Sequence, residues 1–182
     1  MAAEAQPAQI AIRAGEARDV PAVAAIYRHA VLTGTASFEI EPPDEAEMLR
    51  RREAVVSGGH PYLVAECGPI LVGYAYAGPY RPRPAYRNTV ESSIYVHPEW
   101  HGRGAGRMLL SALLAAAEER GFRQIVAVIG DSGNEASIAL HAALGFAHAG
   151  ILRSVGWKHG RWLDSVLMQR ALGSGDATPP AR

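Results

Sequence analysis

Apolar and polar positions alternate along several short segments of the chain and follow helical spacing along others. Alternation, or a short apolar run bounded by Gly and Pro, is typical of a strand, whereas apolar residues three and four apart are typical of a helix. Strands are predicted over residues 10–16, 62–66, 70–77, 89–96, 124–130, 149–155 and 165–170. Helices are predicted over residues 20–31, from Pro43 onward, over residues 104–120 and over residues 136–146. The order β-α-α-β-β-β-α-β-α-β-β indicates an α/β or α+β domain with one mixed sheet.

Several residues mark where these elements begin and end. Asp19 is expected to cap the first helix, because its side-chain oxygen can accept from a free amide there. Gly121 and Gly145 are expected to end the third and fourth helices. The run 124–130 is continuously apolar, which is typical of a strand buried on both faces.

Length and composition narrow the classes of protein that remain. The chain has 182 residues, enough for one domain, which we expect over residues 10–172 between disordered ends at 1–9 and 173–182. Eighteen basic residues balance eighteen acidic ones, which disfavours a nucleic-acid partner. No run approaches the length of a membrane span and no secretory signal is visible, so a cytoplasmic protein is expected. The seven His residues show no metal-ligand spacing, so no metal is expected.

A glycine-rich loop leads from the strand 89–96 into the long third helix. The sequence there is YVHPEWHGRGAGRMLL, with glycines at 102, 104 and 106. Glycines let main-chain amides approach a ligand, and the helix N-terminus adds free donors, so the loop predicts a phosphate or pyrophosphate site. It lacks the Lys of a P-loop and the spacing of a dinucleotide-binding loop. A plain strand-to-helix turn is the alternative.

This loop, HGRGAG, resembles the pyrophosphate-binding segment of the GNAT superfamily of acyl-CoA-dependent N-acyltransferases, although His101 stands where that family has Gln or Arg. The blocks TASFEIEPP, GYAYAGPYRPRPAY, TVESSIYVHP, AVIGDSGNEASIALHAALGF and GILRSVGWKHGRW are similar to the phosphinothricin, methionine sulfoximine and related amino-acid N-acetyltransferases. The resemblance covers about residues 10–172 and implies the GNAT fold: a central mixed, mostly antiparallel sheet with splayed middle strands, flanked by helices.

The resemblance implies acetyl-CoA as co-substrate. It places the coenzyme at Ile94, Tyr95, Val96, His101, Gly102, Arg103, Gly104, Ala105, Gly106, Arg107 and Asn134. The amide of Val96 is the implied oxyanion donor. Asn134 can also cap the fourth helix, since a side-chain amide has separate donor and acceptor ends.

Two residues are candidates for proton transfer. Glu91 shares one strand face with Ser93 and Tyr95, and from position alone it is either a general base or part of a structural ion pair. The resemblance favours the base. His141 lies among apolar helical neighbours and is either packed core or, as the resemblance implies, a general acid or relay toward the departing thiolate.

The stretch GYAYAGPYRPRPAYRNTVE is the candidate acceptor site. Arg suits a carboxylate, so Arg81, Arg83 and Arg87 are candidates to bind one, with solvated loop charges as the alternative. Phe38, Tyr76 and Tyr80 can supply apolar walls. The resemblance implies acceptor contacts at Phe38, Tyr76, Ala77, Gly78, Arg81, Arg83, Thr89, Val90 and Glu91.

The resemblance therefore implies transfer of acetyl from acetyl-CoA to the α-amine of a small amino acid or analogue, by direct attack in a ternary complex. The alternatives are acetylation of another small amine or of a protein N-terminus, and a non-catalytic acyl-CoA sensor. A homodimer is also implied.

Overall fold

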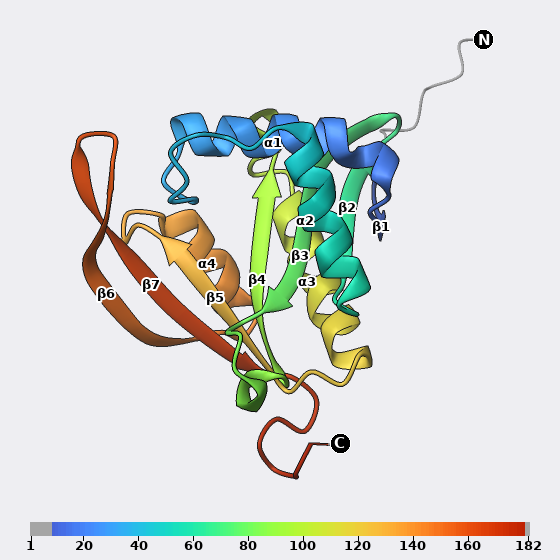
Figure 1. Ribbon diagram of the computed structural model, residues 1–182, viewed down its shortest axis with the longest axis vertical. Coiled ribbons are helices and arrows are strands. Elements are labelled where there is room, and N and C mark those ends of the chain that lie inside the picture. Colours follow the sequence, from blue (N-terminus) through green and yellow to red (C-terminus); the bar gives the residue numbers. More distant parts are fainter. Residues whose placement is uncertain (1–8, 181–182) are drawn as a thin grey trace.

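A seven-stranded sheet organises the protein in the computed structural model, which describes residues 9–180 (Figure 1). Its strands lie in the order β1-β2-β3-β4-β5-β7-β6, with only the β4–β5 pair parallel. The strands are β1 (Ile10–Ala14), β2 (Tyr62–Cys67), β3 (Ile70–Pro79), β4 (Thr89–Val96), β5 (Gln124–Gly130), β6 (Ala147–Lys158) and β7 (Arg161–Ala171). The predicted mixed, mostly antiparallel sheet is confirmed.

Four helices cover the two faces of this sheet (Figure 1). They are α1 (Val20–Thr33), α2 (Glu45–Ser57), α3 (Ala105–Glu119) and α4 (Glu135–Ala143). Neighbouring residues of a strand point to opposite faces, so Val64 packs with α1 and α2 whereas Ala65 packs with α3 and α4. The two faces differ in composition. The α3 side is aliphatic, and the α1–α2 side is rich in tyrosine.

The middle of the sheet opens between β4 and β5. These strands pair only from Thr89 with Gln124 to Ser92 with Ala127. Beyond that point β4 continues to Val96 and β5 continues to Gly130 without pairing to each other. The predicted splayed strands are therefore confirmed, and the main-chain groups on the facing edges of the gap are left for another partner.

Two details differ from the sequence prediction. The hairpin of β6 and β7 is longer than the strands predicted at 149–155 and 165–170. Asp19 precedes α1 but its side chain does not cap that helix, so the predicted capping is wrong. The carboxylate instead accepts from the Arg13 guanidinium at 2.7 and 2.8 Å, and from the amide of Glu16 at 2.7 Å. An arginine donates two parallel charged hydrogen bonds, which outcompete a single amide.

The chain ends are the remaining prediction. The N-terminal segment predicted at 1–9 lies almost wholly outside the described residues. After β7, Arg123 donates to the main-chain oxygens of Gly175 and Thr178, each at 2.8 Å. The domain bounds at 10 and 172 stay a prediction.

Among residues 9–180, no helix combines the length and the apolar character needed to cross a membrane.

Candidate active site

The loop from β4 to α3 presents a row of main-chain amides. Gly102 and Gly104 have φ of 73° and 87°, a left-handed conformation that favours glycine. The first main-chain hydrogen bond into α3 runs from the Met108 amide to the Gly104 oxygen at 3.0 Å. The amides of residues 105–107 therefore have no helical acceptor, and they lie at the positive end of the helix dipole. This arrangement suits a phosphate or pyrophosphate.

The edge of β4 beside the gap adds further donors. The His97 amide bonds to the Val72 oxygen of β3 at 2.8 Å. Because successive residues of a strand alternate in direction, Ile94 and Val96 turn their main-chain groups away from β3 and toward the gap. His101 donates from Nε2 to the Val96 oxygen at 3.0 Å. The imidazole thus pairs the Val96 carbonyl oxygen and leaves the Val96 amide facing the gap.

A cavity of about 840 Å³ joins the glycine loop to this gap. The predicted coenzyme residues that line it are Ile94, Tyr95, Val96, His101, Gly102, Gly104, Gly106, Arg107 and Asn134. Arg103 and Ala105 do not line it. The Arg103 guanidinium lies 5.1 Å from the centre of the Trp100 ring, and the Ala105 side chain is buried in the core. Asn134 accepts from the Ser137 amide at 3.3 Å, so the predicted cap of α4 is confirmed and its amide nitrogen is left for a ligand.

Glu91 lies on β4 and lines a second cavity, of about 360 Å³, on the α1–α2 side of the sheet. It is half-buried, and burial raises the pKa of its carboxyl, an effect that the nearby charge of Arg81 opposes. A carboxylate with a raised pKa beside a cavity fits a general base, since its affinity for a proton is higher than that of a solvated glutamate.

Stacked tyrosines form the sheet side of this second cavity. Tyr62 and Tyr76 lie 5.6 Å apart with rings inclined by 10°, and Tyr74 and Tyr76 lie 6.4 Å apart at 12°. Burial raises the pKa of the Tyr76 hydroxyl, so it stays protonated and can donate a hydrogen bond. The opposite side of the cavity is the helix α2, which contributes Arg51 and Arg52.

The predicted acceptor residues are distributed around this cavity. Tyr76, Gly78 and Glu91 line it. The side chains of Ala77 and Val90 lie on the other face of the sheet, in the aliphatic core. The remaining predicted acceptor residues do not line it.

Thr89 is half-buried at the start of β4, and Arg81 and Arg83 are exposed in the connection from β3 to β4. The Arg81 guanidinium lies 5.1 Å from the centre of the Tyr80 ring. The Phe38 ring lies against Gly156 of β6, where an added Cβ atom would be 2.5 Å from the ring. Phe38, Arg83 and Arg87 line neither of the two cavities.

His141 is 2% exposed and lines a small cavity of about 50 Å³ at the gap between β4 and β5. Its Nδ1 donates to the Ser137 oxygen at 2.8 Å, and a carbonyl can only accept, so the proton of the neutral ring is on Nδ1. Burial lowers the pKa of the ring. His141 is therefore neutral at pH 7, with an Nε2 lone pair available as an acceptor.

Comparison with known proteins bears on this geometry. The model of the Acetyltransferase (GNAT) family matches residues 23–146. The chain belongs to this family. The GNAT family, which the glycine loop and the further sequence blocks resemble, is therefore confirmed.

Several relatives resemble this GNAT chain over most of their length. It is 57% identical to a phosphinothricin N-acetyltransferase of Alcaligenes faecalis, over 89% of this chain and 82% of the relative. It is 43% identical to an L-methionine sulfoximine/L-methionine sulfone acetyltransferase of Pseudomonas paraeruginosa, over 87% of this chain and 92% of the relative. A phosphinothricin acetyltransferase of Sinorhizobium meliloti, crystallised with AcCoA, has a TM-score of 0.92 and 46% identity, covering 95% and 94% of the two chains.

Sequence reasoning missed two parts of the larger cavity of this GNAT domain. One is the end of α1 and the following turn, where Thr33 and Thr35 line it. The other is a pair of charges, since Asp131 and Arg161 line the cavity and form an ion pair. Asp131 has φ of 73°, unusual for a residue other than glycine, and Arg161 belongs to the distant strand β7. No local motif signals such a pair.

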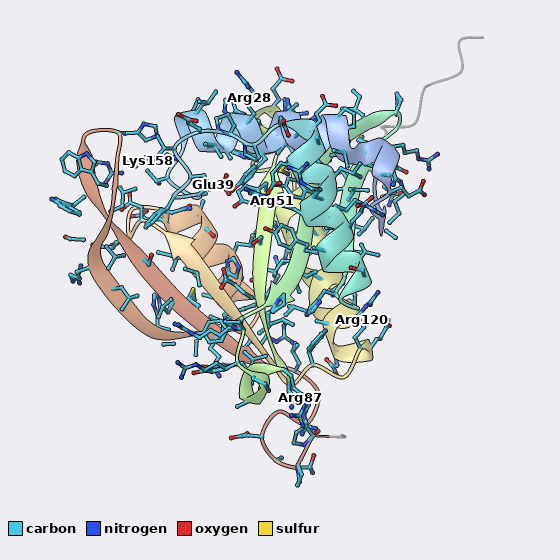
Figure 2. All side chains as sticks on the ribbon, viewed as in Figure 1. Arg28, Glu39, Arg51, Arg87, Arg120 and Lys158 are labelled. Atoms are coloured by element: carbon cyan, nitrogen blue, oxygen red, sulfur yellow. The ribbon has the colours of Figure 1, made fainter. Side chains whose placement is uncertain are left out.

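A polar network connects the hairpin of β6 and β7 to the Glu91 cavity. Lys158 donates to the Ser37 oxygen at 2.7 Å, and the Ser37 hydroxyl lies 2.9 Å from the Tyr27 hydroxyl. Tyr27 donates to Glu39 at 3.0 Å, and Glu39 pairs with Arg51 at 2.6 Å. Figure 2 shows Glu39 beside Arg51 below α1, with Lys158 facing them from the hairpin. The network fixes the segment between α1 and α2, whose first residues, 34–36, line the larger cavity, while Tyr27 and Arg51 of the network line the Glu91 cavity.

Across the part of the chain that the structure describes, no three His, Cys, Asp or Glu side chains gather in a way that could hold an ion.

Proposed function

We propose that the protein transfers the acetyl group of acetyl-CoA to the α-amine of a small amino acid or analogue, of the phosphinothricin and methionine sulfoximine/sulfone type. The observation that carries this proposal is a half-buried carboxylate, Glu91, next to a strand gap that ends in a row of free amides. The printed names of the Alcaligenes and Pseudomonas relatives support the acceptor class. The coenzyme of the Sinorhizobium structure supports the donor.

The reaction uses these groups in sequence. Glu91 takes a proton from the acceptor ammonium, directly or through one water, and the free amine attacks the thioester carbon. The new C–N bond places negative charge on the carbonyl oxygen, which the Val96 amide stabilises, an effect typically worth about 3 kcal/mol. The C–S bond then breaks, the amine loses its second proton, and the coenzyme leaves as the thiol. The products are the N-acetyl amino acid and CoA.

His141 has a role in this scheme as a relay. Its Nε2 carries no proton in the neutral ring, so it accepts a proton from the reacting amine before it can pass one to the sulfur. The lowered pKa of the ring favours rapid release of that proton. Of the two roles that the family resemblance implies, general acid or relay, the unprotonated Nε2 favours the relay.

Arg81 is the proposed partner of the acceptor carboxylate. It extends from the loop beside β4, and its charge already acts on Glu91. An arginine at this position can hold the α-carboxylate while the α-amine faces Glu91.

We also propose a cytoplasmic homodimer. Strand β6 lies at one edge of the sheet and pairs only with β7. It exposes Leu152, Val155 and Trp157, and Trp157 is 57% exposed. An apolar edge strand pairs readily with a second copy of itself. Sedimentation equilibrium should give twice the monomer mass, and V155K should give the monomer mass. A wild-type monomer at micromolar concentration would refute the dimer.

Coenzyme A release tests the proposed reaction. The enzyme is mixed with acetyl-CoA and a panel of acceptors: phosphinothricin, methionine sulfone, a polyamine and a peptide with a free N-terminus. Thiol release should depend on the amino acids, and mass spectrometry should find one added acetyl on the amine. Turnover with the peptide or the polyamine alone would refute the acceptor class. Binding of the coenzyme with no turnover on any amine would indicate a sensor.

A further inference from the structure

The Glu91 cavity extends away from the reacting carboxylate, across the sheet toward α2. In the strand register, Ser93 of β4 lies opposite Tyr76 of β3, which lies opposite Tyr62 of β2. Two strand spacings separate Ser93 from Tyr62, about 10 Å. The cavity is therefore longer than an amine alone requires, and a different charged group lies at its far end.

That group is the guanidinium of Arg52, which lines the cavity from α2. Its Nε and Nη2 donate to the Gly15 oxygen at 3.1 and 2.6 Å, and its guanidinium lies 6.0 Å from the centre of the Tyr62 ring. A Cβ atom at position 15 would lie 2.7 Å from the Tyr62 ring. Glycine at this position therefore lets the Gly15 main chain, with the carbonyl that Arg52 binds, lie close to the ring. The guanidinium is thus fixed over the ring, and it has donors left because arginine carries five N–H groups.

The charge of Arg52 has no carboxylate partner among the residues that the structure describes. None of the ion pairs formed by residues 9–180 includes Arg52. Its neighbour Arg51 differs, since Glu39 and Glu47 contact it at 2.6 and 2.8 Å. The cavity therefore has an anion, Glu91, near the gap and an uncompensated cation at the other end.

We infer that this cavity is the subsite for the acceptor's side chain, and that Arg52 selects side chains ending in an anionic or strongly electronegative oxygen group. The inference rests on the proposed function. The tyrosine rings enclose the methylene groups of such a side chain, while the Arg52 guanidinium donates to its terminal oxygens. A charged hydrogen bond in a half-buried cavity discriminates strongly against a side chain that lacks the acceptor.

Three acceptors with side chains of the same chain length test the inference. Phosphinothricin ends in a charged phosphinate, methionine sulfone has two uncharged oxygens, and methionine has only the sulfur. In R52Q, kcat/KM should fall about 10- to 100-fold for phosphinothricin, about 3- to 10-fold for the sulfone and less than about 2-fold for methionine. R52K keeps the charge and should recover most of the loss for phosphinothricin.

R50Q is the matched control, because Arg50 lies on the same helix, is 67% exposed and lines neither cavity. It should leave all three values unchanged. The KM for acetyl-CoA should be unaffected in every variant. An equal loss for all three acceptors in R52Q, or no loss for phosphinothricin, would overturn the subsite while leaving the acetyltransferase intact. Absence of wild-type turnover with all three would instead refute the proposed function.

Discussion

Replacing Glu91 with Gln tests the proposed base, because the substitution keeps the size of the side chain and removes its ability to take a proton. A positioned general base contributes about 10²- to 10⁴-fold to the rate. We therefore expect kcat to fall by at least about 100-fold. The KM for acetyl-CoA should stay within a factor of two or so, because Glu91 does not line the coenzyme cavity.

The same substitution should lower kcat but raise the free energy of unfolding at neutral pH. Burial raises the pKa of the Glu91 carboxyl above its unfolded value. The folded state therefore binds this proton more tightly than the unfolded state does, and wild-type stability is lost as the pH rises from about 4.5 through the folded pKa. At pH 7, E91Q should have the higher free energy of unfolding, and its advantage should narrow toward pH 4.5.

Thiol-release kinetics and urea unfolding measure the two effects on the same samples. The acid limb of the wild-type kcat/KM profile should have an apparent pKa above 4.5, and E91Q should lack that limb. E99Q, an exposed change in the turn after β4, is the control for both measurements. Wild-type turnover in E91Q, or a variant less stable than the wild type at pH 7, would refute the assignment of Glu91.

Three further perturbations address the rest of the site. G104A should cost about 1 kcal/mol because φ is 87°, and it should raise the KM for acetyl-CoA. G68A, at φ 59° in the β2–β3 turn, which lines neither cavity, should lower the melting temperature similarly without changing that KM. K158M removes the hydrogen bond to the Ser37 oxygen, so urea unfolding should show that the free energy of unfolding falls by about 1–2 kcal/mol. The KM values for both substrates should rise, and unchanged KM values would show that the hairpin does not influence the site. Because burial lowers the pKa of His141, the free energy of unfolding of the wild type should decline as the pH falls below about 6.5. The difference in this free energy between the wild type and H141Q should shrink between pH 7.5 and 5.5, and a constant difference would contradict the buried neutral ring.

The sequence predicts best where chemistry and local structure coincide. The strand with Glu91, the glycine loop and α3 are contiguous, so one stretch of sequence predicts the anion cradle and contains the candidate base, while the family resemblance supplies the fold and favours the base. Only the family resemblance predicts the gap beside Ile94 and Val96, because the gap depends on how β4 pairs with β5, which is distant in the sequence.

Other parts of the site depend on contacts that no local pattern encodes. Arg52 acquires its role through the carbonyl of Gly15, 37 positions earlier, and Asp131 meets Arg161 from another strand. The sequence predicts too short a strand at β6 for a different reason. Nearly all its residues are exposed, so the strand lacks the apolar alternation on which the prediction depended.

A crystal structure of the complex with acetyl-CoA is the most direct test of how the chain binds its donor. We predict that the diphosphate contacts the amides of residues 102–107, and that the thioester lies in the gap between β4 and β5, beside Glu91. A diphosphate bound away from the glycine loop, or a thioester outside that gap, would contradict the proposed site.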